Sequence, residues 1–227
     1  MTARRETLTR ERVLDAALNL VDTQGWAKLS MRRLAAMVGV EAMSLYNHVR
    51  NKRDLLDGMA ARVFEQIELP DPELPWPQRV RALCHHANIC FSAYPAVVGA
   101  LAAGQANPRS PGALRFIDAL LGALLDAGLD ERAAVRHYRS LLAMLFGSVL
   151  ARTGDIADAT GAPDEPITDW FCRTVTAEQL PNLHRTLPAL IDVDCRPDFD
   201  HTIDMFLAGL QATAGESASG PHSTGQR

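Results

Sequence analysis

The stretch from Ser30 to Arg53 constrains this chain most, because it holds two short helical patterns separated by a glycine. A serine at position 30 can cap the first helix, since its side-chain oxygen accepts a hydrogen bond from a free N–H of the first turn. Apolar side chains then recur at helical spacing, at Leu34, Ala35 and Val38. Gly39 follows, and glycine readily adopts the positive φ that ends many helices.

A second short helical pattern opens at Glu41 or Ala42, and its apolar positions Leu45 and Val49 are expected to point inward. The other side chains of this helix project outward: Ala42, Met43, Ser44, Tyr46, Asn47 and His48. Two short helices joined by a tight turn form a helix-turn-helix, whose second helix enters the major groove of DNA. The stretch therefore predicts a DNA-binding module.

The residues GVEAMSLYNHVRNKRDLL, from Gly39 to Leu56, resemble the recognition end of the tetracycline-repressor (TetR) family. The upstream segment VDTQGWAKLSMRRLA fits the same pattern, so the resemblance covers residues 9 to 60; beyond them it is to the general plan of the family. It implies an all-α fold, in which a three-helix helix-turn-helix domain is joined by a connector helix to an all-helical domain for ligand binding and dimerisation.

The resemblance also gives roles to single side chains of the DNA-binding module. Family positions that touch phosphate correspond to Ser30, Arg32, Tyr46, His48 and Lys52. Family positions that face bases correspond to Ala42, Met43, Ser44 and Asn47. Packing beneath the recognition helix remains the alternative for Tyr46.

The function that the resemblance implies is a dimeric transcriptional repressor, bound to palindromic operator DNA and released by a small-molecule effector. Tetracycline is not expected as that effector, because the magnesium-chelating histidine of the tetracycline repressor cannot be aligned with this chain. Two alternatives stay open. The large domain could recruit another protein without any effector, or a His/Cys cluster could serve an enzyme.

The distribution of charge supports a nucleic-acid partner at one end of the chain. The net charge of the 227 residues is −4, yet residues 1–60 hold ten Lys and Arg against seven Asp and Glu. A basic module fused to an acidic body is typical of a DNA-binding protein that carries a second domain.

Four cysteines without a CxxC pair, and no secretory leader, favour reduced thiols in the cytoplasm. No apolar run of about eighteen residues occurs, so no membrane-spanning segment is expected. The chain also lacks GxSxG, HExxH and glycine-rich phosphate-loop motifs, so we expect neither an enzyme nor a cofactor.

Three parts follow along the chain: residues 1–53 form the DNA-binding domain with a flexible N-terminal arm, residues 54–214 the helical domain, and residues 215–227 a disordered Gly/Ser-rich tail. The connector helix is expected over 52–68, ended by the proline-rich segment 70–77. The other helices are expected at 9–25, 77–93, 95–103, 111–128, 131–153, 166–174, 176–191 and 198–213, with Pro181 and Pro188 as breakers and a loop at 154–166.

The pair His85 and His86, beside Cys84 and Cys90, invites a metal-site interpretation. Neighbouring residues of a helix point about a hundred degrees apart, so both histidines cannot readily bind one ion. We therefore expect no metal, and treat one of the histidines as a polar group lining an apolar cavity or as an ordinary core or surface residue.

The segments 84–105, 113–124 and 134–146 hold aromatic and apolar side chains together with a few polar groups, as ligand pockets do. The candidate pocket residues are His85, His86, Asn88, Phe91, Tyr94, Phe116, Leu120, His137, Tyr138 and Met144. Because no Lys or Arg cluster faces them, an uncharged or weakly charged apolar or aromatic effector is expected. An ordinary core is the alternative for each of these residues.

Two apolar stripes near the C-terminal half are broader than a single chain seems to require, and the family pairs such helices across a two-fold axis. The candidate interface residues are Leu141, Leu142, Leu145, Phe146, Val149, Ile203, Phe206, Leu207 and Leu210. The alternative is that both stripes serve only the core of one chain.

Overall fold

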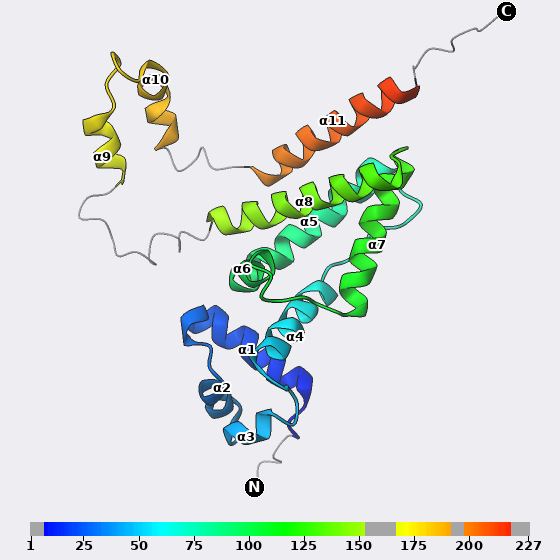
Figure 1. The fold of residues 1–227 in the computed structure, drawn as a ribbon, viewed down its shortest axis with the longest axis vertical. Helices are drawn as coiled ribbons and strands as arrows, with labels where there is room; N and C mark the ends of the chain where they lie inside the picture. Colours follow the sequence, from blue (N-terminus) through cyan, green and yellow to red (C-terminus); the bar gives the residue numbers. More distant parts are fainter. Residues whose placement is uncertain (1–6, 153–166, 192–197, 219–227) are drawn as a thin grey trace, which may run out of the picture.

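The computed structural model describes residues 7–152, 167–191 and 198–218, and every regular element within these ranges is a helix. Figure 1 shows a head made of α1 to α3, from which α4 leads into a body of α5 to α8 with α11 along its upper edge. The all-α fold with an N-terminal helix-turn-helix is therefore confirmed. None of the described helices combines the length and apolar character that crossing a bilayer requires.

The helices of the head begin and end where local signals place them. They are α1 (Arg10–Gln24), the short 3-10 helix η1 (Trp26–Lys28), α2 (Met31–Val38) and α3 (Ala42–Leu45). The Thr9 hydroxyl accepts a hydrogen bond from the backbone N–H of Arg12 at 3.2 Å, and the Ser30 hydroxyl accepts one from Arg33 at 3.3 Å. Gly39 ends α2 in the left-handed conformation, with φ of 72°.

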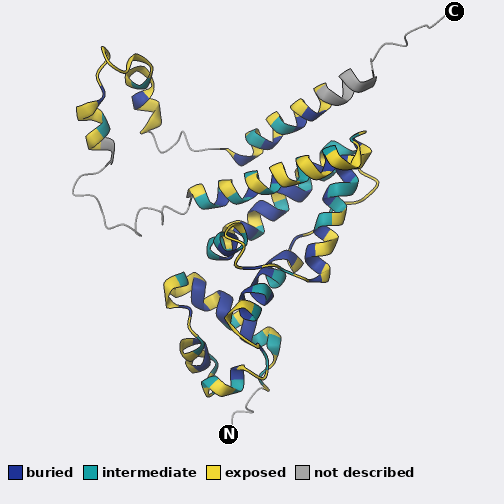
Figure 2. Ribbon diagram, viewed as in Figure 1, coloured by how far each residue is buried: buried dark blue, intermediate teal, exposed yellow. Residues whose placement is uncertain are grey.

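The core of the head is built from the inward faces of its helices. Val13, Ala17, Leu34, Leu45 and Val49 have no exposed surface, which confirms the two inward positions of the second helical pattern. Figure 2 shows this buried layer between α1, α2 and α3. Each large apolar side chain buried there contributes about 1.5–3 kcal/mol, so a head this small depends on nearly all of them.

Helix α4 (Lys52–Glu65) joins the head to the body. The Asn51 side chain caps it by accepting a hydrogen bond from the N–H of Asp54 at 2.9 Å. The helix ends at Glu65, three residues before the expected position 68, because the N–H groups of Gln66 and Ile67 turn back in short bonds to Val63 and Phe64.

Two glycines bring α4 into close contact with its neighbours. A Cβ on Gly58 would lie 2.6 Å from Cδ2 of Leu14 in α1, and a Cβ on Gly112 in α7 (Pro111–Asp126) would lie 3.0 Å from Cα of Glu65. Any side chain at Gly112 would therefore push against the backbone of α4. Helix α4 is held between α1 of the head and α7 of the body.

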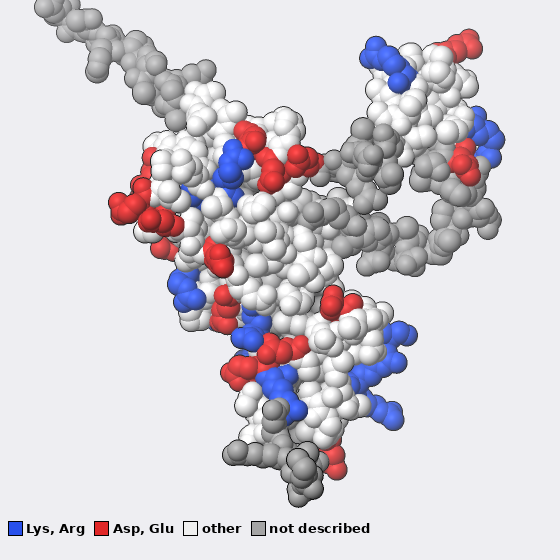
Figure 3. Space-filling view, turned by 180° about the vertical axis from the view of Figure 1, so that it is seen from behind, with Lys and Arg blue, Asp and Glu red and all other residues white. Residues whose placement is uncertain are grey.

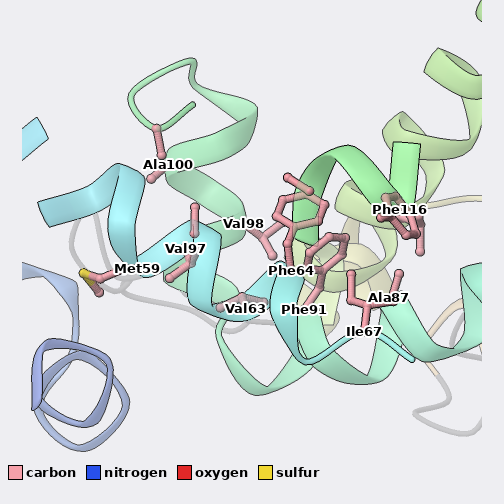
Figure 4. Packing of buried hydrophobic residues seen from close by; sticks show 14 of the residues in the cluster. Met59, Val63, Phe64, Ile67, Ala87, Phe91, Val97, Val98, Ala100 and Phe116 are labelled. Carbon is pink, nitrogen blue, oxygen red and sulfur yellow. The ribbon is translucent and has the colours of Figure 1, made fainter. Parts of the chain in front are cut away.

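The body also contains α5 (Trp76–Ala93), α6 (Pro95–Ala102), α8 (Glu131–Arg152) and α11 (Phe199–Ala218). Phenylalanines from four helices meet in its core: Phe64 lies 5.3 Å from Phe91 and 5.7 Å from Phe116, and Phe91 lies 5.6 Å from Phe146, between ring centroids. Figure 4 shows Phe64 and Phe91 side by side, next to Val98 of α6. Edge-to-face contacts of this kind stabilise a core beyond the area that they bury.

Most body helices match their expected ranges because their caps are local. The Ser110 hydroxyl accepts a hydrogen bond from Ala113 at 3.2 Å, and the Asp130 carboxylate accepts one from Ala133 at 2.7 Å. Two expectations were wrong. Pro181 starts α10 (Pro181–Leu190) instead of breaking it, since the first turn needs no N–H donor there, and Pro188 lies inside that helix.

The C-terminal helix differs as well. Helix α11 continues to Ala218, so residues 215–218 are helical and not part of the expected tail. No proline interrupts this segment, and its alanines and Glu216 favour a helix. Helix α9 (Ile167–Thr174) matches the expected piece at 166–174. The loop 154–166, the first residues of the N-terminal arm and the tail from residue 219 lie outside the described residues.

Candidate DNA interface and effector site

The recognition helix α3 is short and is held from beneath by two buried side chains. Leu45 and Val49 have no exposed surface, and the backbone N–H groups of both His48 and Val49 donate to the carbonyl of Leu45 at 2.9 Å. Residues 46 to 49 therefore continue α3 as a tight turn, and the rest of the helix surface faces outward.

The predicted base-facing positions differ in how far they reach from this surface. Met43 is 73% exposed and Tyr46 is 45% exposed, and Asn47 is also exposed. Ala42 and Ser44 are only partly exposed. The exposure of Tyr46 argues against its packing beneath the recognition helix.

The predicted phosphate-binding positions border α3 on both sides. Ser30, Arg32 and Lys52 are exposed, and His48 is partly exposed. A shallow groove lined by Lys28, Ser30, Arg32 and Arg33 runs along the start of α2. Figure 3 shows basic side chains gathered along one edge of the head. Lys28 and Arg33 were missed from the sequence, although their positions beside Arg32 and the N-terminus of α2 could have indicated them.

A buried ionic network fixes the loop between α3 and α4. The Arg10 guanidinium donates to the backbone carbonyl of His48 at 2.6 Å and also binds the Asp54 carboxylate. The same carboxylate accepts from the backbone N–H of Arg50 at 2.8 Å. The Arg10 guanidinium, followed by these bonds from Arg50, holds the pKa of the Asp54 carboxyl well below its usual range. Neither Arg10 nor Asp54 was singled out from the sequence.

The predicted effector residues fall into three groups. Phe91, Phe116 and Leu120 are fully buried in the body core. Tyr94, Tyr138 and Met144 are partly buried and pack against that core. The histidines lie at its edge: His85 contacts Asp200 of α11 at 3.2 Å, His86 lies 2.8 Å from the Glu68 carbonyl, and His137 packs on Phe206.

One polar pair lies inside this region. The Ser148 hydroxyl of α8 donates to the side-chain oxygen of the buried Asn88 of α5 at 3.1 Å. Phe91 and Phe146, which contact each other, lie three and two residues further along the chain than Asn88 and before Ser148, respectively. The structure thus places a hydrogen-bonding group beside aromatic side chains between α5 and α8. Ser148 was not among the predicted site residues.

The metal-site interpretation receives no support from these residues. Burial raises the pKa of the Cys84 thiol to about 12, so that it stays protonated and is a poor metal ligand. The ring centroids of His85 and His86 are 6.3 Å apart and the two rings bind different partners. Within the described ranges, no three His, Cys, Asp or Glu side chains gather where they could hold an ion.

The apolar stripes proposed for dimerisation are largely used by the chain itself. Six of these side chains are buried within one chain: Leu141, Leu145, Val149, Ile203, Leu207 and Leu210. Leu142, Phe146 and Phe206 are partly buried against the same core. The expectation that the stripes exceed what one chain needs was wrong for those six, because α8 packs them on α5, α6 and α7 while α11 packs on α5.

The opposite faces of these two helices remain exposed and carry small side chains. On α8 this face consists of Ser140, Ala143, Gly147 and Ala151, and on α11 of Met205, Ala208, Gly209 and Ala212. Met205 is the large apolar exception. Small side chains allow two helices to approach closely, so these faces, and not the buried stripes, are available to a second subunit.

Comparison with known proteins agrees with this architecture. Residues 13–59 match the family model of bacterial regulatory proteins of the tetR family, and residues 69–214 match the tetracyclin repressor-like C-terminal domain. The first match covers the helix-turn-helix and the start of α4. The second covers the whole described body, so the two matches together include most of the chain.

Relatives match over nearly the full length. An HTH-type transcriptional regulator of Saccharopolyspora erythraea is 30% identical over 92% of this chain and 86% of its own. The HTH-type transcriptional repressor DrrR1 of Streptomyces coeruleorubidus is 28% identical over 93% of this chain and 82% of its own. Among solved structures, the TetR family protein ActR of Streptomyces coelicolor in complex with actinorhodin superposes with a TM-score of 0.75 at 26% identity, over 92% of this chain and all of ActR. The chain therefore belongs to the TetR family of bacterial transcriptional regulators, whose members bind DNA and are not enzymes.

Proposed function

We propose that this protein is a dimeric repressor that binds a palindromic operator and leaves it when a flat, apolar or aromatic small molecule binds the body. The observation that carries the DNA-binding part is the exposure of Met43, Tyr46 and Asn47 on a helix anchored from below by two buried residues. A recognition helix needs this combination, because its outer side chains must reach base edges while its axis stays fixed.

The backbone of the operator is bound by the cations that border this helix. Arg32 and Lys52 flank α3 from the preceding and the following helix, and the groove at Lys28 and Arg33 adds two more positive charges. Contacts of this kind fix the register of the head on the duplex and supply salt-dependent affinity for any sequence. Direct contacts to bases then fall to Met43, Asn47 and, closer to the helix axis, Ala42 and Ser44.

Two heads are needed to read a palindrome, and the exposed small-residue faces of α8 and α11 are the proposed dimer contact. Pairing these faces would form a four-helix bundle, in which alanine and glycine let the helix axes approach. The two recognition helices of such a dimer must lie about 34 Å apart to enter successive major grooves.

The effector is proposed to enter between α5, α7 and α8. DrrR1 is named a repressor and ActR has been solved with actinorhodin and with (S)-DNPA, which supports a small-molecule ligand for this chain too. Asn88 and Ser148 provide the hydrogen-bonding group, and the phenylalanines beside them provide the apolar surface. Because Phe91 and Phe116 are fully buried, the ligand must displace side chains of the free protein to reach them.

Release from DNA then follows from the position of α4. This helix touches Leu14 of the head through Gly58, and its Glu65 touches Gly112 of α7. A ligand that moves α7 must move α4 and with it the head. It can lower operator affinity only as far as it binds the displaced state more tightly than the DNA-bound state.

The test has two stages. Operator sequences are first selected from random DNA with the purified protein, and an inverted repeat is expected, protected over both half-sites. Flat aromatic compounds, actinorhodin included, are then screened by thermal shift with and without this operator. An effector raises the melting temperature of the free protein and is opposed by operator DNA, because coupling is reciprocal.

If compounds bind equally well with and without operator, they are not effectors. If none binds while the operator is still recognised, a body that recruits another protein is favoured instead. As a regulator of chromosomal genes, the protein would act in the bacterial cytoplasm.

A further inference from the structure

A cavity of about 510 Å³ lies between the head and the body, away from the proposed effector region. The end of α1 and the start of η1 form one wall, with Val21, Asp22, Gly25 and Trp26. The other wall comes from the α5–α6 junction, α6 and α8, with Ala93, Tyr94, Pro95, Ala96, Gly99, Ala100, Gln105 and Leu150. Its volume falls in the range of about 300–1,000 Å³ that is typical of small-molecule sites.

The cavity exists because α6 presents small residues to the head. Ala96, Gly99 and Ala100 line it, and a Cβ on Gly99 would meet only Cδ2 of Leu150, at 3.9 Å. Larger side chains at these positions could fill the space without a clash. The head and the body therefore meet around an open space while α4 makes the close contacts between them.

The chemistry of the walls selects a class of ligand. Trp26 and Tyr94 face the cavity from opposite domains, and both are partly exposed. Asp22 is the one charged side chain among the described residues that line it, and its carboxylate forms no ion pair with any other described residue. Two aromatic rings and one carboxylate suit a flat organic cation, which stacks on the rings and is attracted by their faces and by the carboxylate.

We propose that this interdomain cavity is a second ligand site, and that it binds flat organic cations. The inference is independent of the effector proposed above, since Tyr94 is the one predicted effector residue that lines the cavity. A molecule held here touches both domains, so its affinity depends on their relative position. By linkage, the same molecule changes the affinity for the operator.

Thioflavin T serves as the probe. It is a flat benzothiazolium cation whose emission rises when its rings are immobilised, and its uncharged benzothiazole analogue has nearly the same shape. Titrations of the full-length protein without DNA are expected to show saturable binding of thioflavin T and weaker binding of the analogue. Asp22→Asn removes the charge with little change of shape, so thioflavin T should bind roughly fivefold more weakly while the analogue is unaffected.

Gly99→Leu fills the cavity and should abolish saturable binding of both probes. Gly122→Leu is the matched control, because Gly122 lies on α7 with no atom within 4 Å of an added Cβ. It should bind thioflavin T like the wild type. Melting temperatures confirm that each variant is folded; if Gly99→Leu fails to fold, Ala96→Leu replaces it.

Wild-type binding by the folded cavity-filling variant would overturn the site. Equal loss of both probes, or of neither, in Asp22→Asn would overturn the assignment to a cation. These outcomes are separate from those of the operator test, which needs neither Asp22 nor Gly99.

Discussion

The Arg10 guanidinium and the Asp54 carboxylate form a two-pronged ion pair, with N–O distances of 3.0 and 3.2 Å, which ties the first turn of α1 to the first turn of α4. The same guanidinium holds the His48 carbonyl at the end of the recognition segment. One side chain thus connects the start of the head, the recognition turn and the connector helix.

Asp54→Asn should lower the free energy of unfolding by about 1–2 kcal/mol, the order of a charge-assisted hydrogen bond whose partner is partly exposed. The pKa of the folded carboxyl lies below its usual range. The pair therefore stabilises the fold fully above the pKa of an unfolded Asp, about 3.9, and this contribution is lost as the pH falls below that value. Urea unfolding of wild type and variant, at neutral pH and through this acidic window, measures both effects.

The control is Asp15→Asn, which breaks the more exposed Arg62–Asp15 pair between the same two helices. It should cost less than about 1 kcal/mol. A wild-type loss of stability on acidification that Asp54→Asn does not reduce would contradict the role of this carboxylate.

Lys52→Ala tests the phosphate contacts. Lys52 is exposed at the first position of α4. Its loss should weaken binding to every DNA sequence alike and reduce the slope of log K against log salt by about 0.9, the value for one released counterion. Fluorescence anisotropy at several salt concentrations gives the slope, and a slope equal to that of the wild type would rule the contact out.

Asn47→Ala tests direct reading of a base. Asn47 is exposed on the turn that continues α3. An amide side chain that binds a base edge contributes about 1–3 kcal/mol of discrimination at one base pair. Binding of single-substituted operators should therefore show relaxed choice at one position per half-site, with the salt slope unchanged. Uniform weakening at all positions would place Asn47 on the backbone instead.

Gly112→Ala tests whether α7 communicates with the head through α4. The added Cβ would lie 3.0 Å from Cα and 3.1 Å from the backbone nitrogen of Glu65, so the two helices must separate. We expect a loss of about 1–3 kcal/mol in stability, the usual cost of overpacking, and a change in operator affinity although Gly112 cannot touch DNA. Gly122→Ala, on the same helix in open space, should instead stabilise by about 0.5–1 kcal/mol and leave operator affinity unchanged.

Local signals in the sequence located most of the helices, and long-range ones were out of reach. Ser30, Ser110 and Asp130 were recognised as caps because a cap binds an N–H only three residues away. Arg10 and Asp54 lie 44 residues apart, and nothing near either residue indicates the pairing.

Periodicity had a similar limit. It identified the apolar stripe of α8 but not what covers it, so Leu141 and Leu145 were assigned to a partner subunit although α5 and α7 of the same chain cover them. The cavity beside Trp26 also could not be foreseen. It depends on which helix places its small residues opposite the tryptophan, and in the sequence Trp26 was expected only to fill the core of the head.

The exposed small-residue face of α8 leads to the last prediction, on assembly. Gly147 lies on this face, and an added Cβ meets no atom of the same chain within 4 Å. Gly147→Arg should therefore leave the fold of the single chain intact, while a charged, bulky side chain prevents two such faces from approaching. Analytical ultracentrifugation should find a dimer for the wild type and a monomer of 24.7 kDa for the variant. Operator affinity should fall steeply with it, because one head holds only a half-site. Gly122→Arg, at an equally open position on α7, should remain dimeric; a Gly147→Arg variant that is folded and still dimeric would move the interface to another surface.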